Sequence, residues 1–153
     1  MIEILVSSLV TLLGCVATYF LTITQIRQEI RSSEILDTIG EINAVHSAIV
    51  QIMAQGLTHT NDERMREARA VISRLSDISS RISHLKLPKK KKRNIEIAFV
   101  SFKRSATGVG TNFESANYKP LPISDPYFIN MDDCKQKLNE FLRDARDVNL
   151  LGR

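Results

Sequence analysis

The segment Ile4–Ile26, ILVSSLVTLLGCVATYFLTITQI, contains no charged side chain. At a rise of about 1.5 Å per residue an α-helix over this segment would be about 34 Å long, which exceeds the roughly 30 Å hydrocarbon core of a bilayer. An uncharged stretch of this length is typical of a transmembrane helix. We therefore predict that residues 1–26 form a single membrane anchor.

Other interpretations of this segment fit its sequence less well. A cleaved signal peptide has a basic start and a shorter apolar run, whereas this chain begins with Met1-Ile2-Glu3 and stays uncharged from there through Ile26. Leu12-Leu13-Gly14-Cys15 resembles the lipobox of a lipoprotein, but apolar sequence continues after the cysteine. A buried helix in the core of a soluble protein remains an alternative that the sequence leaves open.

Basic residues follow the anchor and do not precede it. Glu3 is the sole charged side chain before the apolar run, whereas Arg27 and Arg31 follow it closely and Lys89–Arg93 lies further along. Lys and Arg concentrate on the cytoplasmic side of membrane proteins. We therefore expect the N-terminus outside and the remainder of the chain in the cytoplasm.

Small and hydroxylated residues recur along one face of the predicted anchor. Spacings of 4, 3, 4 and 4 residues separate Ser7, Thr11, Gly14, Thr18 and Thr22. Such residues let membrane helices approach closely and bond across the contact. The pattern predicts an association seam for a second copy or for a partner membrane protein. The alternative is that the hydroxyl groups bond only to carbonyls of their own helix.

After the anchor, apolar residues keep helical spacing. A second seam has steps of 4, 3, 4, 3 and 4, and consists of Ile35, Ile39, Ile42, His46, Ile49 and Met53. This spacing is typical of a helix packed in a bundle or against a partner. We expect the anchor helix to continue unbroken to about Gly56. A second helix is predicted over Asn61–Lys86 and should end before Pro88.

The segment 94–106 fits two patterns. Alternating apolar residues suit a strand, whereas a set with helical spacing suits a helix. The helical set is Ile95, Phe99, Phe102 and Ala106. We favour a third helix because the neighbouring segments are helical, and we assign residues 27–106 to a helical hairpin plus this helix.

The last part of the chain contains a loop and a helix. Residues 107–129 are rich in glycine and proline and are predicted as a loop, and residues 130–153 as a C-terminal amphipathic helix with a short tail. The predicted fold class is all-α. It consists of one transmembrane helix that continues into a small antiparallel cytoplasmic bundle of three to four helices.

The run of five basic residues at Lys89, Lys90, Lys91, Lys92 and Arg93 follows the second helix. The two legs of the hairpin would be about 45 and 39 Å long, so the run should return to the membrane surface. Each basic residue near an anionic leaflet contributes about 1 kcal/mol of attraction. We therefore predict contact with anionic lipid headgroups. A solvated loop and a nucleic-acid patch are alternatives, although no aromatic residue is interleaved with the run.

No catalytic, metal or cofactor motif accompanies this architecture. His46, His59 and His84 lack partners at ligand spacing, and Cys134 lies on the apolar face of the last predicted helix. We expect a non-enzymatic protein without cofactor or metal, acting as a membrane scaffold, adaptor or regulatory subunit through protein–protein association. The alternatives are a membrane-active effector or small pore built from oligomerised anchors, and a membrane tether for nucleic acid.

Overall fold

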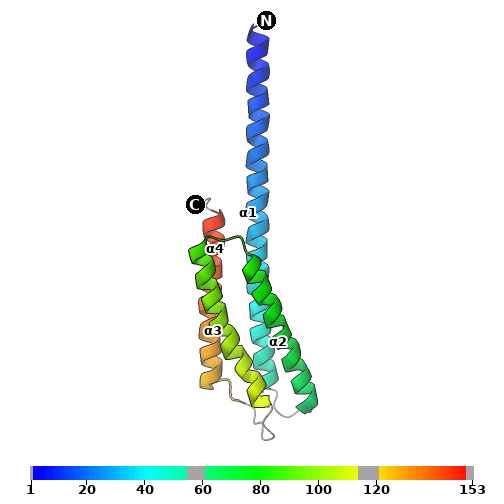
Figure 1. Cartoon of the computed structure of the whole chain (residues 1–153), viewed down its shortest axis with the longest axis vertical. Coiled ribbons are helices and arrows are strands. Elements are labelled where there is room, and N and C mark those ends of the chain that lie inside the picture. The colour runs from blue at the N-terminus through cyan, green and yellow to red at the C-terminus, as the bar shows by residue number, and fades with distance from the viewer. Residues whose placement is uncertain (1, 55–60, 114–120, 151–153) are drawn as a thin grey trace.

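The computed structural model describes residues 2–54, 61–113 and 121–150. Over these ranges the chain forms four α-helices and no strand, which confirms the predicted all-α class (Figure 1). The helices are α1 (Ile2–Ala54), α2 (Asn61–His84), α3 (Lys89–Phe113) and α4 (Pro126–Leu150).

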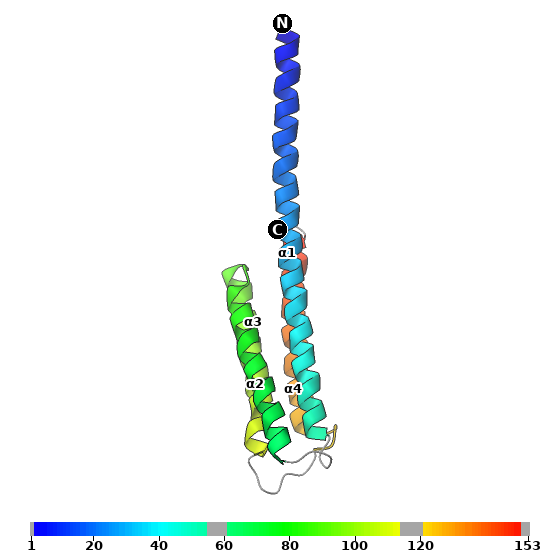
Figure 2. The same cartoon turned by 90° about the vertical axis from the view of Figure 1, so that its right-hand side faces the viewer.

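The longest element, α1, is a single helix of 53 residues, as expected from the unbroken sequence pattern. Its first half stands alone, and its second half packs with the other three helices (Figures 1 and 2). The apolar part of the first half is not buried by any other described segment. Its exposed large side chains are Val10, Leu12, Leu13, Val16, Tyr19, Phe20 and Leu21. By length and composition α1 is able to cross a membrane.

The second half of α1 supplies one wall of the hydrophobic core. The apolar members of the second seam are all buried there: Ile35, Ile39, Ile42, Ile49 and Met53. They pack in one cluster with apolar side chains of the other helices, including Leu75, Ile78, Phe102, Leu138 and Leu142. Removal of these side chains from water is the main favourable contribution to the bundle. The seam is therefore occupied within the chain.

The ambiguous segment 94–106 is helical and lies within α3. All members of its helical set are buried, whereas Ile97, which a strand would place on the same face as Ile95, is 57% exposed. The burial thus follows the helical period.

The predicted loop 107–129 is too long at both ends. Residues 107–113 belong to α3, and α4 already begins at Pro126. Gly108 is tolerated inside α3 because it lies against Tyr127, where an added Cβ would come within 3.3 Å of the tyrosine ring. The glycine therefore permits close packing of α3 on α4 and does not mark a turn.

The start of α4 at Pro126, and not at the predicted Asn130, follows from local capping. The Asp125 Oδ1 atom accepts a hydrogen bond of 2.9 Å from the backbone N–H of Tyr127. Aspartate is a favoured N-cap, and proline is favoured at the first helical position because it has no N–H to satisfy. Asp125-Pro126 is therefore a helix start.

The four helices alternate in direction. In the bundle, α1 and α3 each pack against both α2 and α4. The connection between α2 and α3 and the C-terminal end of α4 lie at the end of the bundle from which α1 emerges (Figure 1). This end, which we call the anchor-side end, therefore gathers the end of α2, the start of α3 and the end of α4 around α1.

Candidate functional site

The basic run forms the start of α3 at the anchor-side end of the bundle. The sequence-based expectation placed it before the third helix, which was predicted from residue 94, but the helix begins at Lys89. The carbonyl oxygen of Pro88 accepts a hydrogen bond of 3.0 Å from the backbone N–H of Lys92, which closes the first turn. The run is therefore a rigid helical turn.

Two lysines of the run are directed into the bundle. Lys91 Nζ donates to the backbone carbonyl of Asp144 in α4 at 3.1 Å, and Lys92 Nζ donates to the carbonyl of Ser83 in the last turn of α2. Both lysine side chains are half-buried. Positive groups stabilise the negative ends of helices. Lys91 and Lys92 thus connect α3 to the C-terminal turns of α4 and α2.

The other three basic residues of the run, Lys89, Lys90 and Arg93, are exposed. Positive charges in the first turn of a helix repel one another and the positive end of the helix dipole, at a cost of several tenths of a kcal/mol each. The contacts of Lys91 and Lys92 offset part of this cost. Contact of the exposed part of the run with anionic headgroups remains a prediction.

A cleft of about 420 Å³ opens beside α1 at the same end. It is lined by Arg27, Ile30, Arg31, Glu34, His84 and Lys86. His84 Nδ1 lies 2.7 Å from the carbonyl oxygen of Ser80, so this ring nitrogen carries a proton. Arg27, Arg31 and Lys86 bring three permanent cations to the cleft, and Glu34 brings one carboxylate.

This cleft was not predicted from the sequence, in which its arginines indicated only the topology and His84 had no partner at ligand spacing. The signal that could have found it is the antiparallel hairpin, because that geometry returns the end of α2 to the first charged residues of α1.

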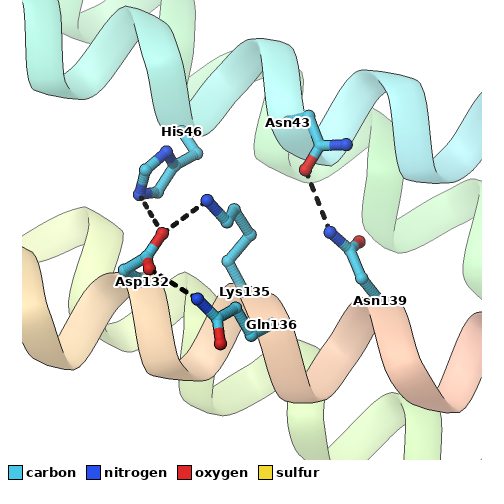
Figure 3. A network of polar contacts seen from close by, with 6 residues as sticks. All are labelled: Asn43, His46, Asp132, Lys135, Gln136 and Asn139. Carbon is cyan, nitrogen blue, oxygen red and sulfur yellow. Dashed lines mark hydrogen bonds and ion pairs between the residues drawn. The ribbon is translucent and has the colours of Figure 1, made fainter.

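A polar network lies between α1 and α4 (Figure 3). His46 Nε2 is 3.4 Å from Asp132 Oδ1, and the same oxygen accepts from Lys135 Nζ. Gln136 Nε2 donates to Asp132 Oδ2 at 2.8 Å. His46, placed by the sequence in the apolar seam, thus lies half-buried against a carboxylate.

A second polar contact connects the same two helices. Asn139 Nδ2 donates to Asn43 Oδ1 at 2.9 Å, and Asn139 is buried (Figure 3). A buried amide needs a partner, so a shift of α4 along α1 would leave it unpaired at a cost of about 1–3 kcal/mol. The pair therefore contributes to the register of α1 against α4, although Asn139 Oδ1 is buried without a hydrogen-bond partner in the described part of the chain.

The environment of the network lowers the pKa values of both titratable members. Burial lowers the pKa of His46, nearby Lys135 lowers it further, and Asp132 partly opposes these effects. The hydrogen bond from Lys135 is the main reason why the pKa of Asp132 lies below its usual range. Both groups therefore favour their unprotonated forms in the folded protein.

The residues predicted as an association seam lie in the exposed half of α1. Thr18 Oγ1 donates to the carbonyl of Gly14, and Thr22 Oγ1 donates to the carbonyl of Thr18, each at 2.9 Å. The side chain of Ser7 lies outside the described side chains. These bonds agree with the alternative interpretation of the threonines, although a hydroxyl oxygen can still accept from a second helix. The seam remains a prediction.

The described residues contain no cluster of His, Cys, Asp and Glu that could hold a metal ion. Cys134 is half-buried against the hydrophobic core, and its Sγ lies 3.8 Å from Ser105 Oγ.

The lysine contacts lead to a first prediction. Lys92→Met removes a charged donor from an α2 carbonyl and should lower the free energy of unfolding by about 1 kcal/mol. Lys90→Met is the matched control in the same helical turn, and should leave the stability unchanged or slightly raised because it removes a repulsive charge. Chemical denaturation of the full-length protein in mild detergent measures both. Equal losses would contradict the assignment of Lys92.

The network leads to a prediction about pH. The pKa of His46 in the folded protein lies below the ordinary 6.5, so the unfolded chain binds the proton more readily. Stability should therefore fall as the pH drops through 6.5, and fall again below 3.8 because the pKa of Asp132 is also lowered.

Denaturation at a series of pH values checks this prediction. His46→Gln should abolish the loss near pH 6.5. His84→Gln, which changes an exposed histidine, should retain it. A rise in stability on acidification would contradict the described environment of His46.

Comparison of the chain with protein-family models, with curated proteins and with solved structures finds no match in any of the three. The function is therefore inferred from the chain's own geometry.

Proposed function

We propose that this protein is a single-pass membrane-anchored scaffold or adaptor that holds a helical bundle against the membrane surface. One observation carries the proposal: no described side chain in the uncharged part of α1 is buried, while the same helix continues into the bundle core. A core helix of a soluble protein would bury that surface. A bilayer is the environment that accepts a bare apolar helix of this length.

The charge distribution supports an orientation with the bundle in the cytoplasm. Arg27 and Arg31 follow the apolar segment directly, and the exposed residues Lys89, Lys90 and Arg93 lie at the same end of the bundle. An excess of Lys and Arg is typical of the cytoplasmic side, where the leaflet is also anionic. The basic end would then rest on the inner leaflet.

Association with other proteins would use surfaces other than the second seam, which is buried in the core. Outside the apolar half of α1, the large apolar side chains exposed in the described part of the chain include Leu36, Ile97, Val100, Ile123 and Ile129. Ile97 also lines a groove of about 340 Å³ between α3 and α4. These surfaces and the anchor seam are the candidates for contact with a partner or a second copy.

The anchor is tested by placing charges on α1 at two depths. Leu12→Arg with Val16→Arg should prevent stable insertion, because each arginine near the centre of a membrane helix costs about 2.5–3.5 kcal/mol. Leu36→Arg is the matched control, since it changes a similarly exposed apolar residue of the same helix. Alkaline extraction of membranes should release the double variant and retain the wild type and the control.

The same membranes report the orientation. A tag at the C-terminus should resist protease added outside intact cells and become sensitive after lysis. Release of the wild-type protein by alkali would contradict the anchor, and cleavage of the tag in intact cells would contradict the orientation.

The association seam of the anchor is tested by replacing its small residues with the larger leucine. An added Cβ at Gly14 meets no other atom within 4 Å, so leucine there disturbs only a second helix packed against it. Thr11→Leu, Gly14→Leu and Thr18→Leu together should weaken self-association in mild detergent, as measured by light scattering. Val16→Leu with Phe20→Leu changes the opposite face and should have no effect. An unchanged oligomeric state in the triple variant would rule the seam out.

A further inference from the structure

The cleft beside α1 contains cations that have no ion-pair partner among the residues that the structure describes. Arg27, Arg31 and Lys86 form no ion pair within the part of the chain that the structure describes, although Glu34 lines the same cleft. Elsewhere in the bundle, Arg74 binds Glu41 at 2.9 Å. Three cations around one open cleft are suited to an anion that comes from outside the chain.

The chemistry of the cleft fits a phosphate group. Arginine presents a planar fork of N–H donors that binds phosphate oxygens in pairs, and lysine adds a compact positive charge. The arginines come from α1, whereas Lys86 lies in the segment between α2 and α3. A phosphate in the cleft would thus be held from two elements.

The depth of the cleft points to a lipid as the source of that phosphate. Arg27 is the first charged residue after the apolar segment, and Arg31 lies about 6 Å further along the helix axis. If Ile4–Ile26 crosses the hydrocarbon core, both arginines lie within the headgroup layer, which is about 5–7 Å thick on each side.

The apolar wall of the cleft is continuous with the anchor. Ile30 lines the cleft and is 54% exposed, and Ile26, one turn closer to the anchor, is 48% exposed. A phospholipid with its phosphate in the cleft could lay its acyl chains along this apolar surface. A soluble anion would gain nothing from it.

We propose that the cleft between α1 and the end of α2 binds the headgroup phosphate of an anionic phospholipid, through Arg27, Arg31 and Lys86. This site differs from the exposed part of the basic run, which attracts an anionic surface without a defined pocket. The inference rests on the proposed membrane anchoring.

The test is the melting temperature of the full-length protein in mild detergent during titration with phosphatidylglycerol or phosphatidylcholine. Ligands that bind the folded state raise this temperature. The wild type should respond to phosphatidylglycerol only. Arg27→Gln with Arg31→Gln should weaken the apparent affinity about tenfold or more, because charged hydrogen bonds to phosphate are lost. Lys86→Gln should weaken it as well.

Two control pairs remove the same number of charges elsewhere. Arg66→Gln with Arg69→Gln changes exposed arginines near the start of α2, far from the anchor-side end, and should have no effect. Lys89→Gln with Lys90→Gln changes the basic end outside the cleft and should weaken binding less than the paired cleft variant. If the Lys89 and Lys90 variant loses as much affinity for phosphatidylglycerol as the Arg27 and Arg31 variant, binding is diffuse attraction to the basic end and the proposed cleft site is wrong.

Three further outcomes distinguish the lipid from a soluble anion and this inference from the proposed function. If inorganic phosphate raises the melting temperature as much as phosphatidylglycerol at equal concentration, the cleft is a site for a soluble anion and the lipid assignment is wrong. If the Arg27 and Arg31 variant stays in the membrane on alkaline extraction but no longer responds to phosphatidylglycerol, the inference is supported. Release of the wild type on extraction refutes the anchor instead.

Discussion

Because α1 does not end where its uncharged segment ends, the apolar rod and the bundle share one helical axis. The uncharged segment ends at Ile26 and the first charged residue after it is Arg27. This point on the axis of α1 marks the end of the bundle at which the other helices begin or end. The hairpin returns α2 to that level, and α3 begins there with its basic turn. The same end of the molecule therefore collects cations from several elements, although they are far apart in the sequence.

The parts of the fold that depend on local spacing could be predicted from the sequence. The buried positions of α1 from Ile35 to Met53, and those of α3 from Ile95 to Ala106, follow a helical period that a short window of residues reveals. The uncharged length of the first segment is also a local property. These features predicted the all-α class and the continuation of α1 beyond the apolar segment.

The parts of the fold that depend on contacts between residues far apart in the sequence could not be predicted from it. Five basic residues argue against a helix start on local grounds, and it is the bond from Lys91 to Asp144, 53 residues away, that helps to offset the repulsion. The cleft forms only where α1 and α2 pack in the observed register. The contact of His46 with Asp132 likewise depends on the register of α1 against α4. By contrast, the start of α4 at Asp125-Pro126 was a local signal that the surrounding prolines obscured.

The absence of a break in α1 also has a mechanical consequence. A helix advances about 100° per residue, so the side of the bundle that faces any neighbour is set by the rotation of the rod about its own axis. A flexible joint at Arg27 would let the bundle turn independently. Without one, insertion of a single residue near that point would swing the whole bundle by more than a quarter of a turn. Because α1 is continuous through this junction, rotation of its apolar half about the helix axis rotates the bundle by the same angle.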